Sequence, residues 1–450
     1  MGLRPRGPGR PESAAPSPEP AAGLPARRAA AAVLFAVLEQ LRPLDDALAE
    51  LGDGKLAGRD RAFARRLVAT ALRRLGEIDA VLASHLAQPL ERAHPRARSA
   101  LRLGVAQIVH LGTPAHAAVS ATVEMMTGHG TDRLKGLVNA VLRRVADGGH
   151  QPREGLAAAR KNTPQWLWTT WERAYGADAA AAIAAAHLAD PPLDLTVPAD
   201  AEGWADRIGG LVQPTGSIRV VDAGPVAELP GYAEGAWWVQ DVAATLPVRL
   251  LGDVAGQSVL DLCAAPGGKS AQLAAAGARV TAVDLSPRRS RLLAENLRRV
   301  GLPAEVITAD AVSWRPPEPA DAVLVDAPCS ATGTIRRHPD ILHLRRREEI
   351  ERLLPLQDQL LAAAVDMVRP GGRIVFATCS LQPEEGMARI AALIAGGAPV
   401  VLDPLRLDEV PGLPEAVTAD GTLRTLPSFW ADAGGMDGFF AARLRRLSTG

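Results

Sequence analysis

All three cysteines in this 450-residue chain lie at or shortly after the ends of short apolar runs, and two of them fall in motifs that could do chemistry. Cys329 ends the sequence Asp326-Ala-Pro-Cys, and Cys379 lies within Thr-Cys-Ser. Cysteine attacks as a thiolate, and basic neighbours or helix ends lower its pKa. Two cysteines after neighbouring predicted strands, with an Asp close to one of them, therefore indicate a site for thiol chemistry.

The segment 258–270 has the pattern of a cofactor site. Val259 to Leu262 is an apolar run typical of a strand buried on both faces. The small residues of 263–268 follow, and a helical pattern begins at Lys269. Small residues let the backbone approach a ligand, and the helix start offers free N–H groups. The G-x-G-x-x-G spacing of dinucleotide sites is absent, which disfavours a nicotinamide cofactor.

Four further predicted strands each end close to a polar residue. The strands are 280–283 before Asp284, 305–308 before Asp310, 322–325 before Asp326, and 373–376 before Cys379. In a doubly wound α/β domain, the carboxyl ends of the strands meet in one crevice. A helix cap is the alternative role for any single Asp, but not for the whole set. The sequence therefore predicts an α/β catalytic domain over residues 251–446.

The rest of the chain divides into regions of different composition. Residues 1–26 are rich in Pro, Ala, Arg and Gly and are predicted to be disordered. Apolar residues at helical spacing predict an all-helical domain over 27–147, with Gly76 closing one helix. Residues 148–162 resemble a polar linker, and 163–250 a small α+β module that packs on the catalytic domain. The fold class expected is thus multidomain, with an all-α part, a small α+β part and an α/β part.

The charge distribution and the cysteine content indicate which partner and which cellular compartment to expect. The chain is neutral overall, but residues 1–150 carry 21 Lys and Arg against 14 Asp and Glu. A basic first third suits an anionic partner, although a solvated helical face is an equal alternative. Three sparse cysteines argue against a disulfide framework, for a reducing cytoplasm, and against a zinc site. We expect a cytoplasmic protein, without metal or membrane association.

Several motifs together resemble a known family. DLCAAPGGKS, VDLS, TAD, DAPCSATGTIRRHPDI and ATCSLQPEEG are similar to the ordered motifs of the Sun/Fmu family of S-adenosylmethionine-dependent RNA cytosine-C5 methyltransferases. The similarity covers most of the predicted catalytic domain, which implies a class I, Rossmann-like methyltransferase fold. LRLGVAQIVHLGTPAHAAVS and GLVNAVLRRV resemble the NusB-type RNA-binding domain. Together with IRRHPDI, this helical region resembles the family branch that acts on bacterial 16S rRNA.

The resemblance also implies roles for residues. Cys379 would be the nucleophile and Cys329 the release helper, although a Pro-Cys pair also resembles the nucleophile of DNA cytosine-C5 methyltransferases. Asp326 would lie between cofactor and cytosine, paired with Lys269, while Asp284 would hold the ribose and Asp310 the adenine side. The loop around the methionine end of S-adenosylmethionine would comprise Cys263, Ala264, Ala265, Pro266, Gly267, Gly268 and Lys269.

Some assignments stay open at the level of sequence. Arg336, Arg337 and His338 are predicted either to grip phosphates or to form a solvated loop. Family members have an Arg and an Asn where this chain has Thr196 and Pro198, so RNA contacts there are in doubt. The expected partner is RNA, in the first place 16S rRNA, bound by a monomer. The alternatives are the same chemistry on tRNA or another rRNA cytosine, an inactive rRNA-binding assembly factor, or a dinucleotide oxidoreductase.

Overall fold

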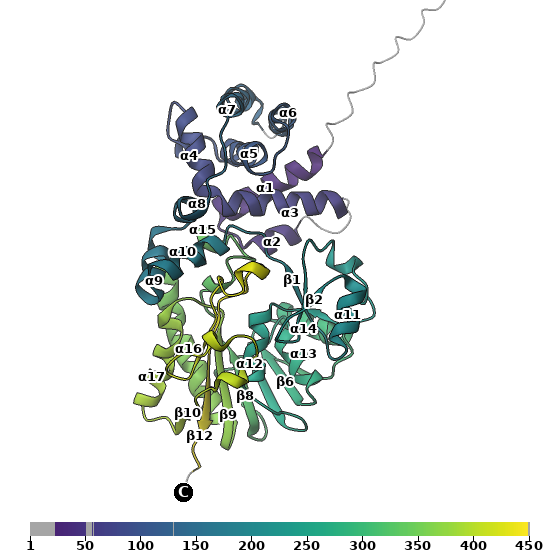
Figure 1. The fold of residues 1–450 in the computed structure, drawn as a ribbon, viewed down its shortest axis with the longest axis vertical. Helices are drawn as coiled ribbons and strands as arrows, with labels where there is room; N and C mark the ends of the chain where they lie inside the picture. Colours follow the sequence, from purple (N-terminus) through teal and green to yellow (C-terminus); the bar gives the residue numbers. More distant parts are fainter. Residues whose placement is uncertain (1–22, 51–55, 57, 129, 449–450) are drawn as a thin grey trace, which may run out of the picture.

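The computed structural model describes residues 23–50, 56, 58–128 and 130–448. Helices occupy one end of the molecule, a large α/β unit occupies the other, and a small sheet and three helices lie between them (Figure 1). This arrangement confirms the predicted fold class. Most of the tail predicted to be disordered, residues 1–22, lies outside the described residues.

The helical domain has one apolar core, built from residues at helical spacing such as Leu67, Leu72 and Leu101. Its helices are α1 (Leu24–Gln40), α2 (Leu44–Ala49), α3 (Gly58–Arg73), α4 (Leu75–His85), α5 (Pro95–Val105), α6 (Ala115–Met125) and α7 (Lys135–Asp147), with a π-helical turn at Ala106–His110. Helix α1 begins inside the segment expected to be disordered, because Leu24 and Ala26 are buried in this core.

Two local predictions here were wrong. Gly76 does not close a helix but lies in the first turn of α4. A Cβ atom at this position would come within 2.1 Å of the Lys161 carbonyl oxygen, so the glycine serves a close helix crossing. The crossing partner is α8 (Gly155–Asn162), which occupies half of the expected linker. Ala158 and Ala159 of α8 are buried, and small apolar residues in a polar stretch left too weak a pattern to predict this helix.

Two separate clusters make up the region between the helical and α/β parts. Helices α9 (Gln165–Tyr175) and α10 (Ala177–Ala186) pack on Ile335 and Ile341 of the catalytic domain. The small antiparallel sheet has the order β2-β3-β1-β4 and is covered by α11 (Ala201–Ile208). Its strands are β1 (Leu193–Thr196), β2 (Leu211–Val212), β3 (Ile218–Val220) and β4 (Trp238–Val239). Trp237 and Trp238 are buried and serve as core residues.

The α/β domain is built on a twisted sheet of order β10-β12-β9-β8-β5-β6-β7, and β11 also pairs with β12. The central strands run parallel, and β12 is antiparallel to β9. The strands are β5 (Ser258–Leu262), β6 (Arg279–Asp284), β7 (Glu305–Thr308), β8 (Ala320–Asp326), β9 (Val368–Thr378), β10 (Val400–Leu402), β11 (Leu423–Arg424) and β12 (Phe440–Arg446). Strand β12 lies inside the sheet, because β9 pairs with one side of it and β10 with the other.

Helices cover both faces of this sheet and form two apolar layers. One layer uses α12 (Leu246–Arg249), α13 (Gly268–Ala275) and α14 (Pro287–Arg299), and the other α16 (Arg347–Met367) and α17 (Met387–Ala395). Helix α15 (Ile341–Leu344) lies at the boundary with the helical domain. Within the described residues, no helix has the length and apolar content needed to cross a membrane.

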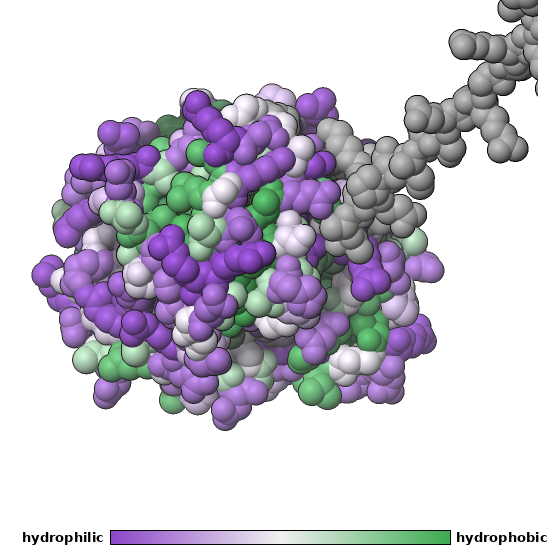
Figure 2. Space-filling model, turned by 90° about the horizontal axis from the view of Figure 1, so that it is seen from above, coloured by the Kyte–Doolittle hydropathy of each residue, from purple (hydrophilic) through white to green (hydrophobic). Residues whose placement is uncertain are grey.

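The end of the molecule formed by the helical domain is largely hydrophilic, with a smaller hydrophobic area on the same face (Figure 2). Exposed arginines of this domain include Arg65 and Arg66 on α3. The basic character predicted for the first third is therefore displayed, at least in part, to solvent.

Candidate active site

The loop after β5 turns sharply because of its residue types. Cys263 has a φ of 61°, in the left-handed region, and Gly267 has a φ of 105°. A Cβ atom at Gly267 would lie 2.5 Å from Leu293 of α14, so a glycine fits there and larger residues do not. Helix α13 then begins at Gly268, so its first N–H groups face the loop.

A cavity of about 450 Å³ opens beside this loop at the carboxyl ends of the strands. Of the predicted site residues, those that line the cavity are Ala264, Ala265, Pro266, Gly268, Lys269, Asp326 and Cys379. Those that do not line it are Cys263, Gly267, Asp284, Asp310 and Cys329. The structure therefore brings together residues from the ends of β5, β8 and β9, as the spacing predicted for the crevice.

Lys269 and Asp326 form an ion pair at the bottom of this cavity. The Nζ atom of Lys269 lies 2.7 Å from Oδ2 of Asp326 and 5.2 Å from the ring centre of Phe439. Burial opposes the charge on Lys269, but the attraction of Asp326 outweighs it and raises the pKa of Lys269. Lys269 is thus held as a cation in a nearly enclosed position, 9 % exposed.

Asp284 and Asp310 differ in position. Asp284 is buried, accepts hydrogen bonds from the backbone N–H groups of Ala265 (3.2 Å) and Ser286 (3.0 Å), and so supports the loop from below. Asp310 is exposed, and its Oδ1 accepts a hydrogen bond from the backbone N–H of Val312 at 3.0 Å. That contact is a local turn rather than a helix cap, since the described chain runs from Asp310 to β8 without a helix.

The two cysteines at the strand ends are in contact. Their Sγ atoms lie 3.5 Å apart, a sulfur–sulfur hydrogen-bond distance. The hydrogen bond to Cys379, followed by burial, raises the pKa of Cys329 well above the usual range of a thiol. Cys329 therefore keeps its proton and can donate it to the sulfur of Cys379. Cys263 is separate from this pair, and burial raises its pKa to about 12.

Two acidic residues of the site, Asp261 and Glu385, were not predicted from the sequence. Asp261 accepts a hydrogen bond from Ser270 Oγ at 2.6 Å, but its Oδ1 is buried without a hydrogen-bond partner among the described residues. Burial raises the pKa of Asp261 to about 7. Glu385 is fully buried beneath the cysteine loops and is contacted by both. Glu385 lies in the motif ATCSLQPEEG, but the sequence does not indicate which residues contact it.

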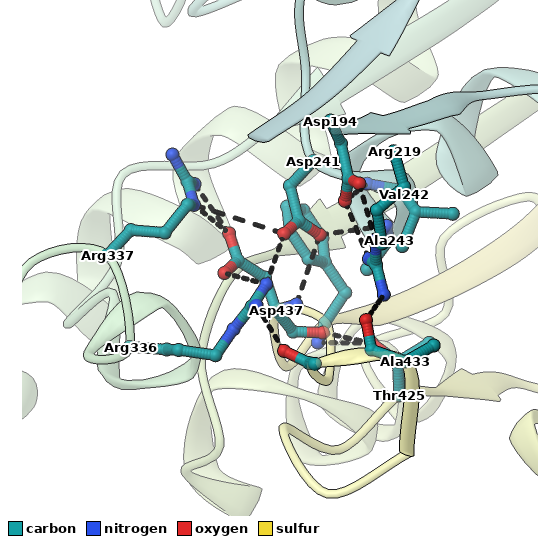
Figure 3. A network of polar contacts seen from close by, with 12 residues as sticks. Asp194, Arg219, Asp241, Val242, Ala243, Arg336, Arg337, Thr425, Ala433 and Asp437 are labelled. Atoms are coloured by element: carbon teal, nitrogen blue, oxygen red, sulfur yellow. Dashed lines mark hydrogen bonds and ion pairs between the residues drawn. The ribbon is translucent and has the colours of Figure 1, made fainter. Parts of the chain in front are cut away.

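The two arginines after the Pro-Cys loop join a network of ion pairs in which Arg336 is buried and Arg337 is partly exposed (Figure 3). Arg336 is 1 % exposed and lies 2.8 Å from Oδ2 of Asp241. Arg337 donates to Asp437 at 2.8 Å and also lines the cavity. Asp437 in turn donates its backbone N–H to Asp241 at 3.0 Å. Both expectations for Arg336 were wrong, because its acidic partners lie far away in the sequence.

The helical domain also reaches the cavity. Pro43 and Asp45, at the start of α2, are part of its lining. Asp45 lies 3.3 Å from Nδ1 of His338, and this hydrogen bond lowers the pKa of Asp45. The backbone N–H of Leu44 donates to Asp340 at 3.0 Å. The wall of the cavity is therefore shared between the helical domain and the α/β domain.

The loop and cavity fit a cofactor with several polar groups. Small residues leave the backbone of 264–268 open to the cavity, and helix α13 presents its N–H groups beside it. The unpartnered oxygen of Asp261 offers an acceptor to a bound group. Cys379 opens on the same space, so a group held by the loop would lie near the thiol pair.

Both the helical domain and the α/β domain match known protein families. Residues 248–445 match the family described as 16S rRNA methyltransferase RsmB/F, and residues 24–147 match the NusB family. The ribosomal RNA small subunit methyltransferase B of Xanthomonas campestris pv. campestris is 36% identical, over 86% of this chain and 91% of its own length. The protein of the same name from Pseudomonas putida is 36% identical, over 94% of this chain and 99% of its own.

Two solved structures share the fold. The crystal structure of PH0851 superposes with a TM-score of 0.75 and covers 93% of this chain and 99% of that one, at 22% identity. NSun6 from Pyrococcus horikoshii, solved with SFG, has a TM-score of 0.54 and 19% identity, and covers 63% of this chain and 98% of that one. At these identities the similarity establishes the fold alone.

Proposed function

Because the chain belongs to the 16S rRNA methyltransferase RsmB/F family and is therefore a ribosomal RNA methyltransferase, we propose that it methylates C5 of a cytosine in 16S rRNA through a covalent adduct of Cys379. The observation that carries this proposal is the pair of thiols at 3.5 Å, one of which faces the cofactor cavity. One sulfur can attack while the other stays within reach of the same bond.

In this proposal, S-adenosylmethionine supplies an electrophilic methyl group, and the residues of the chain prepare the cytosine. The thiolate of Cys379 adds to C6, which places electron density on C5. Cys379 is assigned this role because it opens on the cavity, whereas Cys329 holds its proton. The segment 263–269 would hold the methionine end of the cofactor, Asp284 would support it on the ribose side, and Asp310 would lie toward the adenine.

Lys269 and Asp326 are proposed to balance charge at the base. Asp326 lines the cavity between the loop and Cys379, and its ion pair with Lys269 fixes its orientation. In this position, the carboxyl group of Asp326 can share a proton with N3 of a cytosine in a hydrogen bond. Pre-positioned charges of this kind stabilise a developing charge without reorganising during the reaction.

Release of the product is proposed to depend on Cys329. Once C5 carries the methyl group, transfer of the C5 proton to a water molecule and cleavage of the bond between C6 and the sulfur of Cys379 restore the ring. The electron pair of the C6–S bond returns to the sulfur as that bond breaks, and the C5–H electrons form the C5–C6 double bond. The protonated thiol of Cys329 can donate a hydrogen bond to the departing sulfur and stabilise it as a leaving group.

Binding of 16S rRNA is proposed to involve both ends of the molecule. The helical domain displays exposed arginines and contributes to the cavity wall. Contacts of arginine with phosphate would make binding fall with added salt. A cytosine within a stem would have to be flipped out or presented in an unpaired loop to reach the cavity. A monomer acting in the cytoplasm is sufficient for this scheme.

The test uses each cysteine as the control for the other. Cys379→Ala should abolish methyl transfer from labelled S-adenosylmethionine to 16S rRNA but retain cofactor binding. Cys329→Ala should accumulate a covalent protein–RNA adduct on denaturing electrophoresis, because bond formation is intact and release is slowed. Bisulfite mapping of rRNA and tRNA would identify the base. Full activity of Cys379→Ala, or labelling confined to tRNA, would contradict the proposal.

A further inference from the structure

We propose that Glu385 is a positioning residue that clamps the two cysteine loops together and thereby sets the separation of the thiols. The inference rests on the proposed roles of Cys379 and Cys329. It concerns a residue that neither touches the cavity nor carries a reactive group in the scheme above.

The side chain of Glu385 is fully buried and receives four hydrogen bonds. Oε1 accepts from the backbone N–H of Ser330 at 2.9 Å and from Nε2 of Gln357 at 3.0 Å. Oε2 accepts from Oγ of Ser380 at 2.6 Å and from Oγ of Ser330. Because Ser330 follows Cys329 and Ser380 follows Cys379, one carboxyl group joins the residues next to both thiols.

The surroundings of Glu385 show that this contact is more than local capping. Gln357 of α16 also donates to the carbonyl of Pro328 at 2.9 Å, directly before Cys329. The carboxyl group is therefore tied to the Pro-Cys loop on both sides of the cysteine. Oγ of Thr378, before Cys379, donates to the backbone carbonyl of Glu385 at 3.0 Å. Both cysteines are thus flanked by residues that are bonded, directly or through Gln357, to Glu385.

Length and acceptor capacity explain why a glutamate occupies this position. Carboxylate oxygens only accept, and each oxygen here meets two donors. An aspartate is one methylene shorter and cannot reach both loops. A glutamine keeps the length, and its NH₂ group can face the two serine hydroxyls, which can rotate to accept. The clamp should therefore depend on reach more than on charge.

The clamp is not the only tie between the loops. The backbone N–H of Gly333 donates to the carbonyl of Cys379 at 2.9 Å, and that of Leu381 donates to Oγ1 of Thr332 at 3.0 Å. These bonds remain when Glu385 is replaced. We therefore expect the loops to loosen rather than separate when the clamp is removed.

The experiment measures thiol proximity directly, in the full-length protein without RNA or cofactor. Phenylarsine oxide binds two thiols that lie together, losing its oxygen as water, so its affinity reports on the Cys329–Cys379 pair. Glu385→Asp and Glu385→Ala should weaken binding about tenfold, the effect of losing a buried hydrogen bond to a charged group. Glu385→Gln should bind the arsenical nearly as the unchanged protein does. Cys329→Ser should lose the bidentate binding altogether.

Glu384→Gln is the matched control, since the neighbouring Glu384 side chain is 46% exposed. It should leave arsenical binding unchanged. Arsenical affinity of Glu385→Asp equal to that of Glu384→Gln would overturn the inference. If Glu385→Ala does not fold, Glu385→Asp and Ser380→Ala decide, with thermal unfolding as the check on folding. Because the arsenical needs no substrate, a failure of the methylation scheme and a failure of the clamp are separate results.

Discussion

At the scale of single residues, the site depends on two identical thiol groups in different positions. Cys329 and Cys379 are in contact, but the hydrogen bond between them and burial keep the proton on Cys329. A pair of identical, equally exposed thiols would not divide the proposed roles of attack and release. The difference comes from position, because Cys379 lines the cavity and Cys329 lies behind it.

Asp261 offers a prediction at the same scale. Burial raises its pKa from 3.8 to about 7, so between these pH values the folded protein holds a proton that the unfolded chain has lost. This proton favours the folded state below about pH 4, and the benefit is lost as the pH rises toward 7. Asp261→Asn removes that dependence. Urea unfolding from pH 4 to pH 8 should therefore show a flatter stability curve for the variant than for the unchanged protein.

Asp310→Asn is the control for this measurement, because Asp310 is an exposed acid at the end of β7. Its curve should run parallel to that of the unchanged protein. Parallel curves for Asp261→Asn as well would show that Asp261 is not held protonated in the folded chain.

The positions of residues at the cavity were predictable where the argument needed only local sequence. The small residues at 263–268 and the polar residue after each strand are visible in a short window, and most of them line the cavity. Arg336 and Glu385 were not predictable in this way. Their function is set by Asp241 and Ser330, which are 95 and 55 residues away in the chain. No periodicity or composition records such a pairing.

At the scale of elements, the cysteine loops meet through close backbone packing. A Cβ atom at Gly333 would lie 1.9 Å from the carbonyl oxygen of Gly438 and 2.9 Å from that of Cys379. Gly333→Ala must therefore push the Pro-Cys loop away from the ends of β9 and β12. We expect a loss of about 1–3 kcal/mol in unfolding free energy and a larger loss of methyl transfer, because the thiols are displaced.

Gly136→Ala is the matched control for this change. Gly136 lies in α7, and a Cβ atom there would meet nothing within 4 Å. Its stability should be unchanged or slightly higher, since alanine favours helix over glycine. Methyl transfer by Gly333→Ala at the rate of Gly136→Ala would show that the loops can separate without harm.

At the scale of elements, the strands were predicted correctly, whereas elements whose structure depends on contacts with distant residues were not. The five parallel strands were found from contiguous apolar runs, because both faces of the sheet are covered by helices. Gly76 was misjudged because glycine after a helical stripe usually ends the helix, whereas here it admits the carbonyl of Lys161. Helix α8 was missed for the related reason that its burial is created by contacts with α10 and α4 rather than by its own pattern.

At the scale of the whole molecule, three parts of the chain meet at the cavity. The helical domain contributes Pro43 and Asp45, the segment leading from the small sheet contributes Gln240 and Asp241, and the α/β domain contributes the loop and Cys379. None of these parts alone encloses the space. The cavity therefore depends on contacts that hold the parts in one arrangement.

Arg336 lies where these parts join. Its guanidinium pairs with Asp241 after the small sheet and donates to the carbonyl of Gly434 at 2.7 Å, in the C-terminal segment. Its own carbonyl accepts from Arg73 of α3 at 2.9 Å. Figure 3 shows how the side chains converge on Asp241 and Asp437, both of which are buried. A cation removed from this point leaves two buried acids with fewer partners.

Arg336→Met should therefore destabilise the protein by about 3–5 kcal/mol, the range for breaking one side of a buried ion pair. Burial and the nearby Asp437 already raise the pKa of Asp241, so the loss of Arg336 removes the group that opposes this shift. Hydrogen exchange should increase in the small sheet and in the 431–437 segment together, because both are anchored at this residue. Urea unfolding gives the free energy of unfolding.

Arg346→Met is the matched control. Arg346 is an exposed arginine ten residues further along the chain, and its substitution should change neither measurement. If the two variants unfold alike, the parts of the molecule are held together by contacts other than this network.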